Sequence, residues 1–401
     1  MSTDARKPPA QIALRIRRAL GGKAGWNGVA VQLGFAAVLG WIGYEIIANA
    51  RTNLETQHIA AGFGFLRNNA GFDVNQTLIS YTGSDTFLRV FVVGLLNTLV
   101  VSLVGIIFAT ALGFVVALCR LSPNWLLSRV GEIYVEIIRN LPLLFQILFW
   151  YLAVLAALPN PRASISLFGL VFVSNRGLVI PRPIGEAGFE PFLAAAAFGI
   201  LASLALRIQA RRALFREGRM IRIWPYVLGL LFALPLLTML VFGAPFALEL
   251  PQLKGFNFAG GARIIPEFVA LTLALSIYTA AFIAEIVRAG ILSVHKGQME
   301  AGSSLGLSRG TTLRLIVMPQ AMRVIVPPLT NQYLNLTKNS SLAVAIGYPD
   351  LVSVFAGTSL SQTGQAIEII AMTMGVYLAL SLATSLVMNI YGARLNRSLG
   401  A

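Results

Sequence analysis

The chain has 401 residues, of which 56% are hydrophobic and only 12% are charged, and its mean hydropathy is +0.75. These values exclude an ordinary soluble globular protein and predict one that crosses a membrane several times. A net charge of +15 would suggest nucleic-acid binding in a soluble chain, but Lys and Arg also accumulate in cytoplasmic loops of membrane proteins, so no nucleic-acid partner is predicted. The single cysteine, Cys119, excludes an intrachain disulfide, and two separated histidines predict no metal site.

The N-terminal part is predicted to hold a basic tail and one additional span. Residues 1–28 are expected to be a cytoplasmic tail, either disordered or partly amphipathic at the lipid headgroups. Within residues 29–85, Val29–Ala48 is apolar for about the ~20 residues that a spanning helix needs. Ala48-Asn49-Ala50 resembles a signal-peptidase site, but the apolar run is longer than the usual ~7 to 15 residues, which favours a retained anchor. The mixed-charge stretch Arg51–Asp85 is expected to be a periplasmic loop.

Seven further apolar segments follow, and with the first they predict an all-α bundle of about eight spans. Hydrocarbon offers no partner to free backbone groups, so apolar runs of this length are expected to be helices. Alternating sides then place both termini and the arginine-rich loops, including 207–222, in the cytoplasm. Pro159–Pro191 holds no convincing span and is expected to be a β-hairpin or a re-entrant turn outside the membrane. The predicted segments are Phe91–Leu118, Ile133–Leu158, Phe192–Leu206, Trp224–Phe242, Pro266–Leu292, Val324–Ile346 and Ile369–Tyr391.

Two groups of polar residues near span ends have predicted structural roles. Pro142 is expected to break or kink the third segment, just after Arg139. Glu285 and Arg288 lie one helical turn apart and are expected to form an intrahelical pair at the cytoplasmic end of the sixth segment, rather than to bind substrate.

The segment from Gln298 to Pro319, QMEAGSSLGLSRGTTLRLIVMP, lies between two strongly apolar segments. Small residues are expected to form one short helix that ends near Gly306. Ser308 is then a candidate N-cap for a second short helix, Thr311–Met318, which Pro319 is expected to stop. Two such helices at an angle would project from the membrane as a knob with a small surface and one orienting charge, at Glu300.

This segment resembles the EAA loop of ATP-binding-cassette (ABC) importer permeases. That pattern reads Glu-Ala-Ala, three residues, Gly, nine residues, Ile-x-Leu-Pro. Here Gly302 stands for the second alanine and Met318 for the leucine, and both keep the small or apolar character. The matching residues are Glu300, Ala301, Gly302, Gly306, Ile316 and Pro319.

Other stretches are similar to the polar-amino-acid branch of the same family and, by length and layout, to a permease of a general L-amino-acid importer. They are RNLPLL from Arg139 to Leu144, YTAAFIAEIVRAGI, and PQAMRVIVPPLTNQYLNLTKNSSLA. The resemblance implies a type I importer permease domain over 86–395, with an inserted region at about 160–255 and a coupling loop at 297–320. It also implies three partners: a dimer of ATPase subunits, a second homologous permease and a periplasmic amino-acid-binding protein.

The resemblance implies that this chain is not an enzyme and binds no cofactor, whereas ATP and Mg²⁺ are used by the partner ATPase. No G-x-x-x-x-G-K-[ST] phosphate loop occurs in the sequence, which agrees with that division of labour. The implied function is a permease subunit in the bacterial inner membrane that imports polar or general L-amino acids. Opines or another polar solute remain an alternative. A secondary transporter would need buried ionisable groups, for which only Lys338 is a candidate.

A polar stripe marks the seventh segment, where four residues recur at intervals of three and four. Polar groups at membrane depth are costly and usually face a cavity or another helix. Two interpretations therefore stand side by side: the stripe lines a translocation path, with Lys338 attracting a substrate carboxylate, or it forms hydrogen bonds between permease subunits. The stripe consists of Asn331, Asn335, Lys338 and Asn339.

Overall fold

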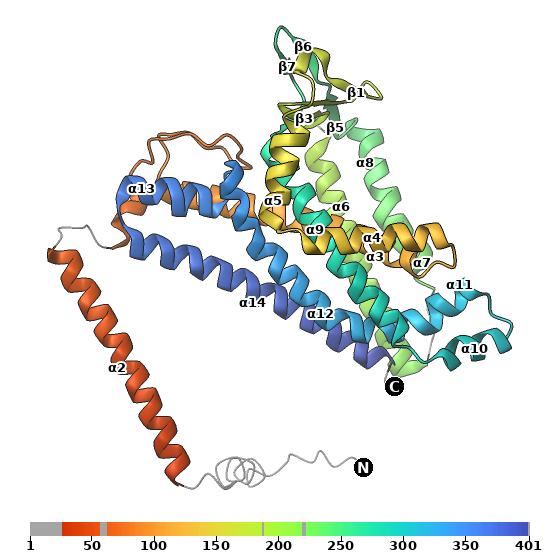
Figure 1. The fold of residues 1–401 in the computed structure, drawn as a ribbon. Helices are drawn as coiled ribbons and strands as arrows, with labels where there is room; N and C mark the ends of the chain where they lie inside the picture. Colours follow the sequence, from red (N-terminus) through yellow and green to blue (C-terminus); the bar gives the residue numbers. More distant parts are fainter. Residues whose placement is uncertain (1–25, 57–61, 187, 219–221, 400–401) are drawn as a thin grey trace.

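The computed structural model describes residues 26–56, 62–186, 188–218 and 222–399. Nearly all of the predicted basic tail, residues 1–25, lies outside the described residues. Long helices dominate the described part, and the prediction of a helical membrane protein is confirmed in this coarse form (Figure 1). The longer helices are α2 (Trp26–Thr56), α3 (Phe87–Arg120), α4 (Trp125–Asn140), α6 (Phe189–Glu217), α9 (Pro266–Leu292), α12 (Met318–Asn339) and α14 (Ala366–Leu399).

Five helices in the described residues are long and apolar enough to cross a membrane, and a sixth span is possible if the bent pair Trp125–Asn140 and Leu143–Leu155 counts as one. The predicted number of eight is therefore not confirmed. Of the missing segments, α12 carries too many polar residues, and the apolar part of α2, Ala30–Ile46, is short. The five are Phe87–Arg120, Phe189–Leu214, Trp224–Phe242, Pro266–Leu292 and Ala366–Leu395.

The core of the bundle forms where α3, α9 and α12 pack against one another. Small residues make this possible: a Cβ on Gly113 of α3 would lie 2.6 Å from Cγ2 of Ile283, and one on Gly290 of α9 would lie 2.3 Å from Cγ1 of Ile325. Lipid tails are as apolar as the helix surfaces, so membrane helices gain little from burying apolar surface against one another. Close backbone approach and dense packing therefore provide much of the attraction between them.

Short helical pieces connect the long ones. After α3 and α4 come α5 (Leu143–Leu148) and a π-helical segment, Phe149–Leu155. Residues 189–242 form a helical hairpin. Its first arm is α6, and its second arm consists of α7 (Trp224–Leu228), a π-helical turn and α8 (Leu234–Phe242). The arginine-rich stretch expected as a loop is largely helical, because α6 continues to Glu217. After α12 the chain passes through a 3-10 segment (Ser340–Ile346), a π-helical segment (Val352–Ser359) and α13 (Leu360–Thr363).

The all-α prediction needs one correction, because the described residues include eight short strands between Ile165 and Ile264. Four of them form an antiparallel sheet in the order β1-β2-β3-β8, and two further pairs are β4-β5 and β6-β7. Of the two alternatives for Pro159–Pro191, the β-hairpin is the one found. The strands are β1 (Ile165–Leu167), β2 (Val171–Ser174), β3 (Gly177–Ile180), β4 (Arg182–Gly185), β5 (Phe246–Glu249), β6 (Gln252–Lys254), β7 (Asn257–Ala259) and β8 (Ala262–Ile264).

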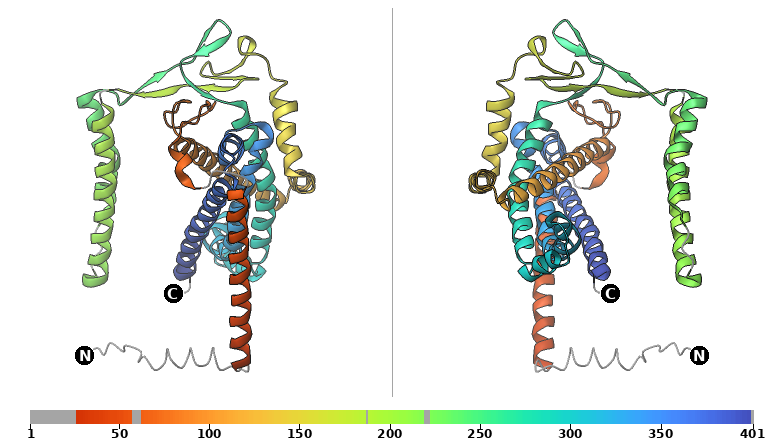
Figure 2. Two further views of the ribbon diagram at one scale, coloured as in Figure 1. Left: turned by 90° about the vertical axis from the view of Figure 1, so that its left-hand side faces the viewer. Right: turned by 90° about the vertical axis from the view of Figure 1, so that its right-hand side faces the viewer.

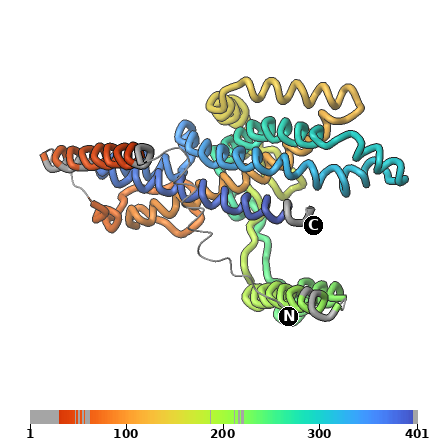
Figure 3. The backbone as a smooth tube through the Cα atoms, turned by 90° about the horizontal axis from the view of Figure 1, so that it is seen from below, coloured from red at the N-terminus to blue at the C-terminus, as the bar shows by residue number. Residues whose placement is uncertain are grey.

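The strands and the 297–320 loop lie at opposite ends of the bundle, and α9 runs from one end to the other (Figure 1). We refer to these ends as the strand end and the loop end. The hairpin of α6 with α7 and α8 stands apart from the bundle and is joined to it through the strands (Figures 2 and 3).

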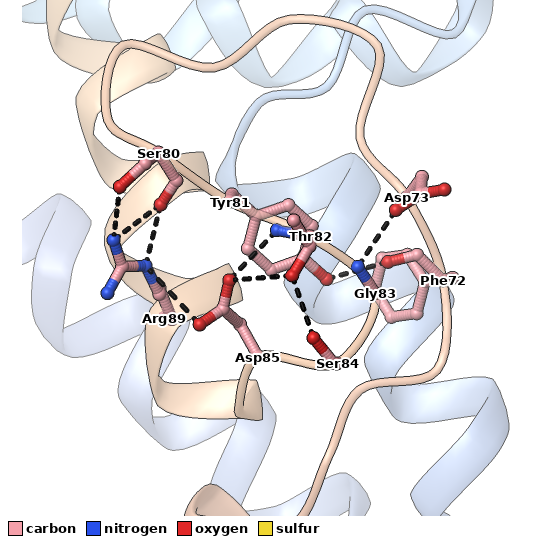
Figure 4. A network of polar contacts seen from close by, with 9 residues as sticks. All are labelled: Phe72, Asp73, Ser80, Tyr81, Thr82, Gly83, Ser84, Asp85 and Arg89. Atoms are coloured by element: carbon pink, nitrogen blue, oxygen red, sulfur yellow. Dashed lines mark hydrogen bonds and ion pairs between the residues drawn. The ribbon is translucent and has the colours of Figure 1, made fainter.

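The segment 68–86, which precedes α3 and contains no helix, also lies at the strand end. Arg89 of α3 donates from Nε to the carbonyl oxygen of Ser80 at 2.8 Å, and Asp73 accepts from the N–H of Gly83 at 2.8 Å (Figure 4). The hydroxyl of Tyr81 donates to the carbonyl oxygen of Phe72 at 2.7 Å. These bonds give a segment without regular structure a defined shape.

Candidate functional site

The 297–320 loop forms two short helices, with the first ending near Gly306 and the second capped by Ser308, as predicted. The first, α10 (Lys296–Ser304), stops before Gly306, whose φ of 74° is a conformation that glycine adopts at little cost. The second, α11 (Arg309–Thr312), begins at Ser308, whose Oγ accepts from the N–H of Thr311 at 3.2 Å. Figure 1 shows the two helices projecting beyond the bundle at the loop end.

The predicted stop at Pro319 is wrong. A π-helical segment, Leu313–Val317, follows α11 directly and leads without a break into α12, in which Pro319 is the second residue. The N–H of Met318 bonds to the carbonyl oxygen of Leu313, five residues earlier, so the turn before the proline is wider than in an α-helix. A proline in the first turn of a helix removes little, because N–H groups there have few partners inside the helix.

Within the loop, the residues of the predicted motif divide between the outer surface and the packed interior. Glu300, Ala301 and Gly306 are exposed, whereas Gly302 is buried, and Ile316 and Pro319 are half-buried. The most exposed apolar side chain is Leu305 at the tip, with 76% of its surface accessible. A cavity of about 630 Å³ opens beside Glu300, between the loop and the end of α3. The loop thus presents a surface that is both charged and apolar.

An ion-pair cluster lies where α3 and α9 end. The predicted pair is present: Nη2 of Arg288 lies 2.6 Å from Oε1 of Glu285. The second carboxylate oxygen of Glu285 also pairs with Arg120, the last residue of α3. All three side chains are partly buried, so the cluster ties two long helices together just before the loop begins.

The third predicted span bends by 106° between Trp125–Asn140 and Leu143–Leu155, at Leu141 and Pro142. Pro142 therefore sits at the predicted break. Gln146 stabilises the break, because its Nε2 donates to the carbonyl oxygens of Ile138 at 3.0 Å and Leu141 at 3.1 Å. Those oxygens are at a helix end that has no further N–H groups to bond.

Arg139, which the sequence grouped with the kink, does not bond across the break. Its guanidinium carbon lies 5.0 Å from the centre of the Phe282 ring, which is a cation–π distance. Arg139 thus packs α4 against α9, and with Glu136 and Asn140 it lines a cavity of about 440 Å³ beside the Glu285 cluster.

The polar stripe of α12 faces away from the rest of the chain. Asn331, Asn335 and Lys338 are exposed and Asn339 is half-buried, while Leu336 next to them is fully buried. Their side chains make no hydrogen bond within the part of the chain that the structure describes. Because amide groups exposed to lipid are costly, this face requires water or another protein subunit against it.

The expectation that Lys338 is the one buried ionisable group is wrong. Lys338 is exposed, whereas Asp350, which sequence reasoning did not select, is fully buried between α12 and the π-helical segment that follows. Its Oδ1 accepts from the N–H of Ser353 at 2.8 Å, and its Oδ2 lies 3.4 Å from the hydroxyl of Tyr377. Nothing in the spacing of Asp350 within the sequence signals its burial.

Near Asp350, a buried asparagine joins three parts of the strand end. Nδ2 of Asn97 in α3 donates to the carbonyl oxygens of Gln76, at 2.9 Å, and Pro349, at 2.8 Å. Asn97 thus bridges α3, the segment before α3 and the chain between α12 and α14.

No group of three or more His, Cys, Asp or Glu side chains in the described ranges could hold a metal ion. Fold and loop together define the class: a helical membrane protein with several spans, whose ordered two-helix loop projects at one end. The chain belongs to the family of inner membrane components of binding-protein-dependent transport systems, whose model matches residues 109–399.

Three relatives match nearly the whole chain. An amino-acid ABC transporter permease protein of Escherichia coli K12, YhdX, is 55% identical over 90% of this chain and 92% of the relative. The general L-amino acid transport system permease protein AapQ of Rhizobium johnstonii is 48% identical over 86% of each chain. The glutamate/glutamine/aspartate/asparagine transport system permease protein BztB of Rhodobacter capsulatus is 42% identical over 90% of this chain and 91% of the relative.

Proposed function

We propose that the chain is the permease subunit of an ATP-driven importer of polar or general L-amino acids, built around a type I permease core. One observation carries the coupling role: the 297–320 loop is an ordered, projecting pair of helices with Glu300 and Leu305 exposed. The amino-acid substrate class rests on the relatives, since permeases of amino-acid systems match this chain along most of its length.

The proposed complex contains a dimer of ATPase subunits at the loop end, a second homologous permease and a periplasmic amino-acid-binding protein at the strand end. ATP and Mg²⁺ belong to the ATPase, and this chain performs no catalysis. Both termini would then be cytoplasmic, and the first span and the inserted region at about 160–255 would be additions to the core. Support comes from the arginine-rich stretch 207–222 at the end of α6, which the positive-inside rule assigns to the cytoplasmic side.

The geometry suggests how loop movement would reach the substrate path. The π-helical segment makes α11 and α12 one continuous rod, so a displacement of the knob would pass directly to the helix that carries Asn331 and Asn335. The cluster around Glu285 would hold α3 and α9 together while α12 moves. Alternating access would follow as ATP binding and hydrolysis drive the ATPase dimer through its closed and open states.

The test is a co-purification of the membrane complex with Glu300→Arg beside the unmodified chain, scoring retention of the ATPase subunit and ATP-dependent uptake of amino acids. Glu186→Arg, an exposed carboxylate in the strand region, is the matched control. We expect Glu300→Arg to lose the ATPase or coupled uptake while still inserting into the membrane. Intact docking and ATP-dependent uptake would refute the coupling role of the loop.

The same preparation distinguishes the proposed function from two alternative functions. Import of opines or another polar solute, with no import of amino acids, would keep the ATPase coupling and change only the substrate class. A gradient-driven carrier would transport without ATP and respond to the ion gradient, and buried Asp350 is then the first group to substitute.

A further inference from the structure

A polar cavity of about 710 Å³ lies at the strand end, apart from the loop and the stripe. Four separate parts of the chain build it: the segment before α3, the π-helical segment after the bend, the turn between β2 and β3, and the junction of β8 with α9. The residues that matter for its chemistry are Gln76, Tyr151, Asn175, Arg176, Arg263 and Glu267.

The walls of this cavity are held by contacts already described. The segment containing Gln76 is fixed by the bonds of Figure 4, and Asn97 ties its backbone to the bundle. The pairing of β3 with β8 places Val179 opposite Arg263, which brings Arg263 near the turn that carries Arg176. The cavity is therefore formed by ordered structure and not by a loose surface fold.

Opposite charges line the cavity without neutralising one another. Oε1 of Glu267 accepts from the hydroxyl of Tyr151 at 2.8 Å. Arg176 donates to Oδ1 of Asn257, and Arg263 makes no ion pair within the described part of the chain. No guanidinium nitrogen of either arginine lies within 4.0 Å of the Glu267 carboxylate, although Arg263 is only four residues away.

A free α-amino acid has the complementary charges. Its carboxylate suits a guanidinium, which binds carboxylates through two parallel hydrogen bonds, and its ammonium group suits a carboxylate. Amide side chains such as those of Gln76 and Asn175 can bond polar substituents. A simple anion would be repelled by Glu267, and a simple amine would leave both guanidinium groups unmatched.

We propose that this cavity is a binding site for the α-amino acid zwitterion at the strand-end mouth of the path, with Arg263 and Arg176 holding the carboxylate and Glu267 with Tyr151 holding the ammonium group. The site rests on the proposed function and deepens it, since it would receive substrate released by the binding protein. Recognition of the two groups that all α-amino acids share also fits a carrier of broad specificity.

The experiment uses the complete complex in lipid nanodiscs without the binding protein. Equilibrium binding of radiolabelled L-glutamine, L-glutamate, L-arginine and L-alanine is measured for the unmodified complex, Glu267→Gln and Arg263→Gln. Arg182→Gln and Glu249→Gln, which lie on the paired strands β4 and β5 outside the cavity, are the controls. We expect binding to weaken roughly tenfold or more in the two cavity variants, about the effect of one lost charge-assisted contact, and to stay within about twofold in the controls.

A second measurement does not depend on these variants being stable. Thr77 also lines the cavity, so Thr77→Cys in a Cys119→Ser background provides a single thiol there. We expect amino acids, but neither their N-acetylated nor their decarboxylated forms at the same concentration, to slow its reaction with a membrane-impermeant maleimide.

Unchanged binding in both cavity variants, or no protection of the thiol, would overturn the proposal. So would a loss confined to the affinity for the loaded binding protein, because the cavity would then be a docking surface. Uptake by the unmodified complex distinguishes the proposed function from the proposed site. No amino-acid uptake refutes the proposed function, whereas normal uptake together with unchanged binding in the cavity variants refutes only this site.

Discussion

A Cβ atom placed on Gly302 would lie 2.5 Å from Cγ2 and 2.7 Å from Oγ1 of Thr312. Gly302 is thus the point at which α10 closes on α11, and the distance between the two helices of the knob is set there. Contacts under 3.0 Å force a shift, and Thr312 is short, branched and almost fully buried.

We therefore expect Gly302→Ala to destabilise the loop by about 1–3 kcal/mol, the usual cost of overpacking. ATP-dependent uptake should fall in proportion to ATPase retention. The double variant Gly302→Ala/Thr312→Ala removes both clashing atoms and should restore docking. Normal docking of the single variant, measured by co-purification, would mean that the contact does not define the knob.

The break in the third segment depends on the Gln146 side chain as well as on Pro142. Gln146→Leu keeps the volume but leaves the carbonyl oxygens of Ile138 and Leu141 without a donor. We expect a loss of about 1–3 kcal/mol, seen as a lower thermal unfolding midpoint of the purified chain. Gln252→Leu, an exposed strand position, is the control. Equal midpoints for both variants would contradict this role.

The two interpretations of the α12 stripe predict different failures. If the stripe lines the path, Asn335→Leu should abolish uptake while assembly of the complex and ATPase binding survive. Thr330→Val, on a neighbouring face of α12, should leave all three unchanged. Loss of assembly in Asn335→Leu would instead assign the stripe to the contact between permease subunits.

Burial raises the pKa of Asp350, in the connection after α12, from its usual 3.8 to about 7. The folded state then favours the neutral acid, so its contribution to stability is complete below about pH 4 and is lost as the pH rises through 7. We expect the thermal midpoint to fall between pH 5 and pH 8, by the equivalent of about 1–3 kcal/mol.

Asp350→Asn imitates the neutral acid and keeps the oxygen that accepts from Ser353, so its midpoint should depend less on pH. Glu190→Gln, an exposed position, should retain the dependence of the unmodified chain. Equal pH profiles for Asp350→Asn and the unmodified chain would show that Asp350 is charged when folded.

Features that depend on a few neighbouring residues could be predicted from the sequence. The membrane class follows from composition, the break follows from Pro142, and the end of α10 and the start of α11 follow from Gly306 and the Ser308 cap. Each is a local property of hydropathy, ring geometry or capping, and remains the same in any fold that keeps the segment helical.

The predicted helix stop at Pro319 was wrong although it rested on equally local signals, because the wider π-helical turn that joins α11 to α12 was not visible in the sequence. The count of eight spans was not confirmed for a different reason. Hydropathy identifies apolar runs, but α12 carries too many polar residues and the apolar part of α2, Ala30–Ile46, is short.

The sequence by itself determined the class of this protein, the family pattern of its loop and most helix positions. Only the tertiary structure decided which distant residues meet: Arg120 with Glu285, Asn97 with Pro349, and the strand residues with α9 around the cavity. The reason is physical. Hydropathy, caps and breaks act over a few residues, whereas burial and charge pairing depend on how helices separated by a hundred residues or more pack together.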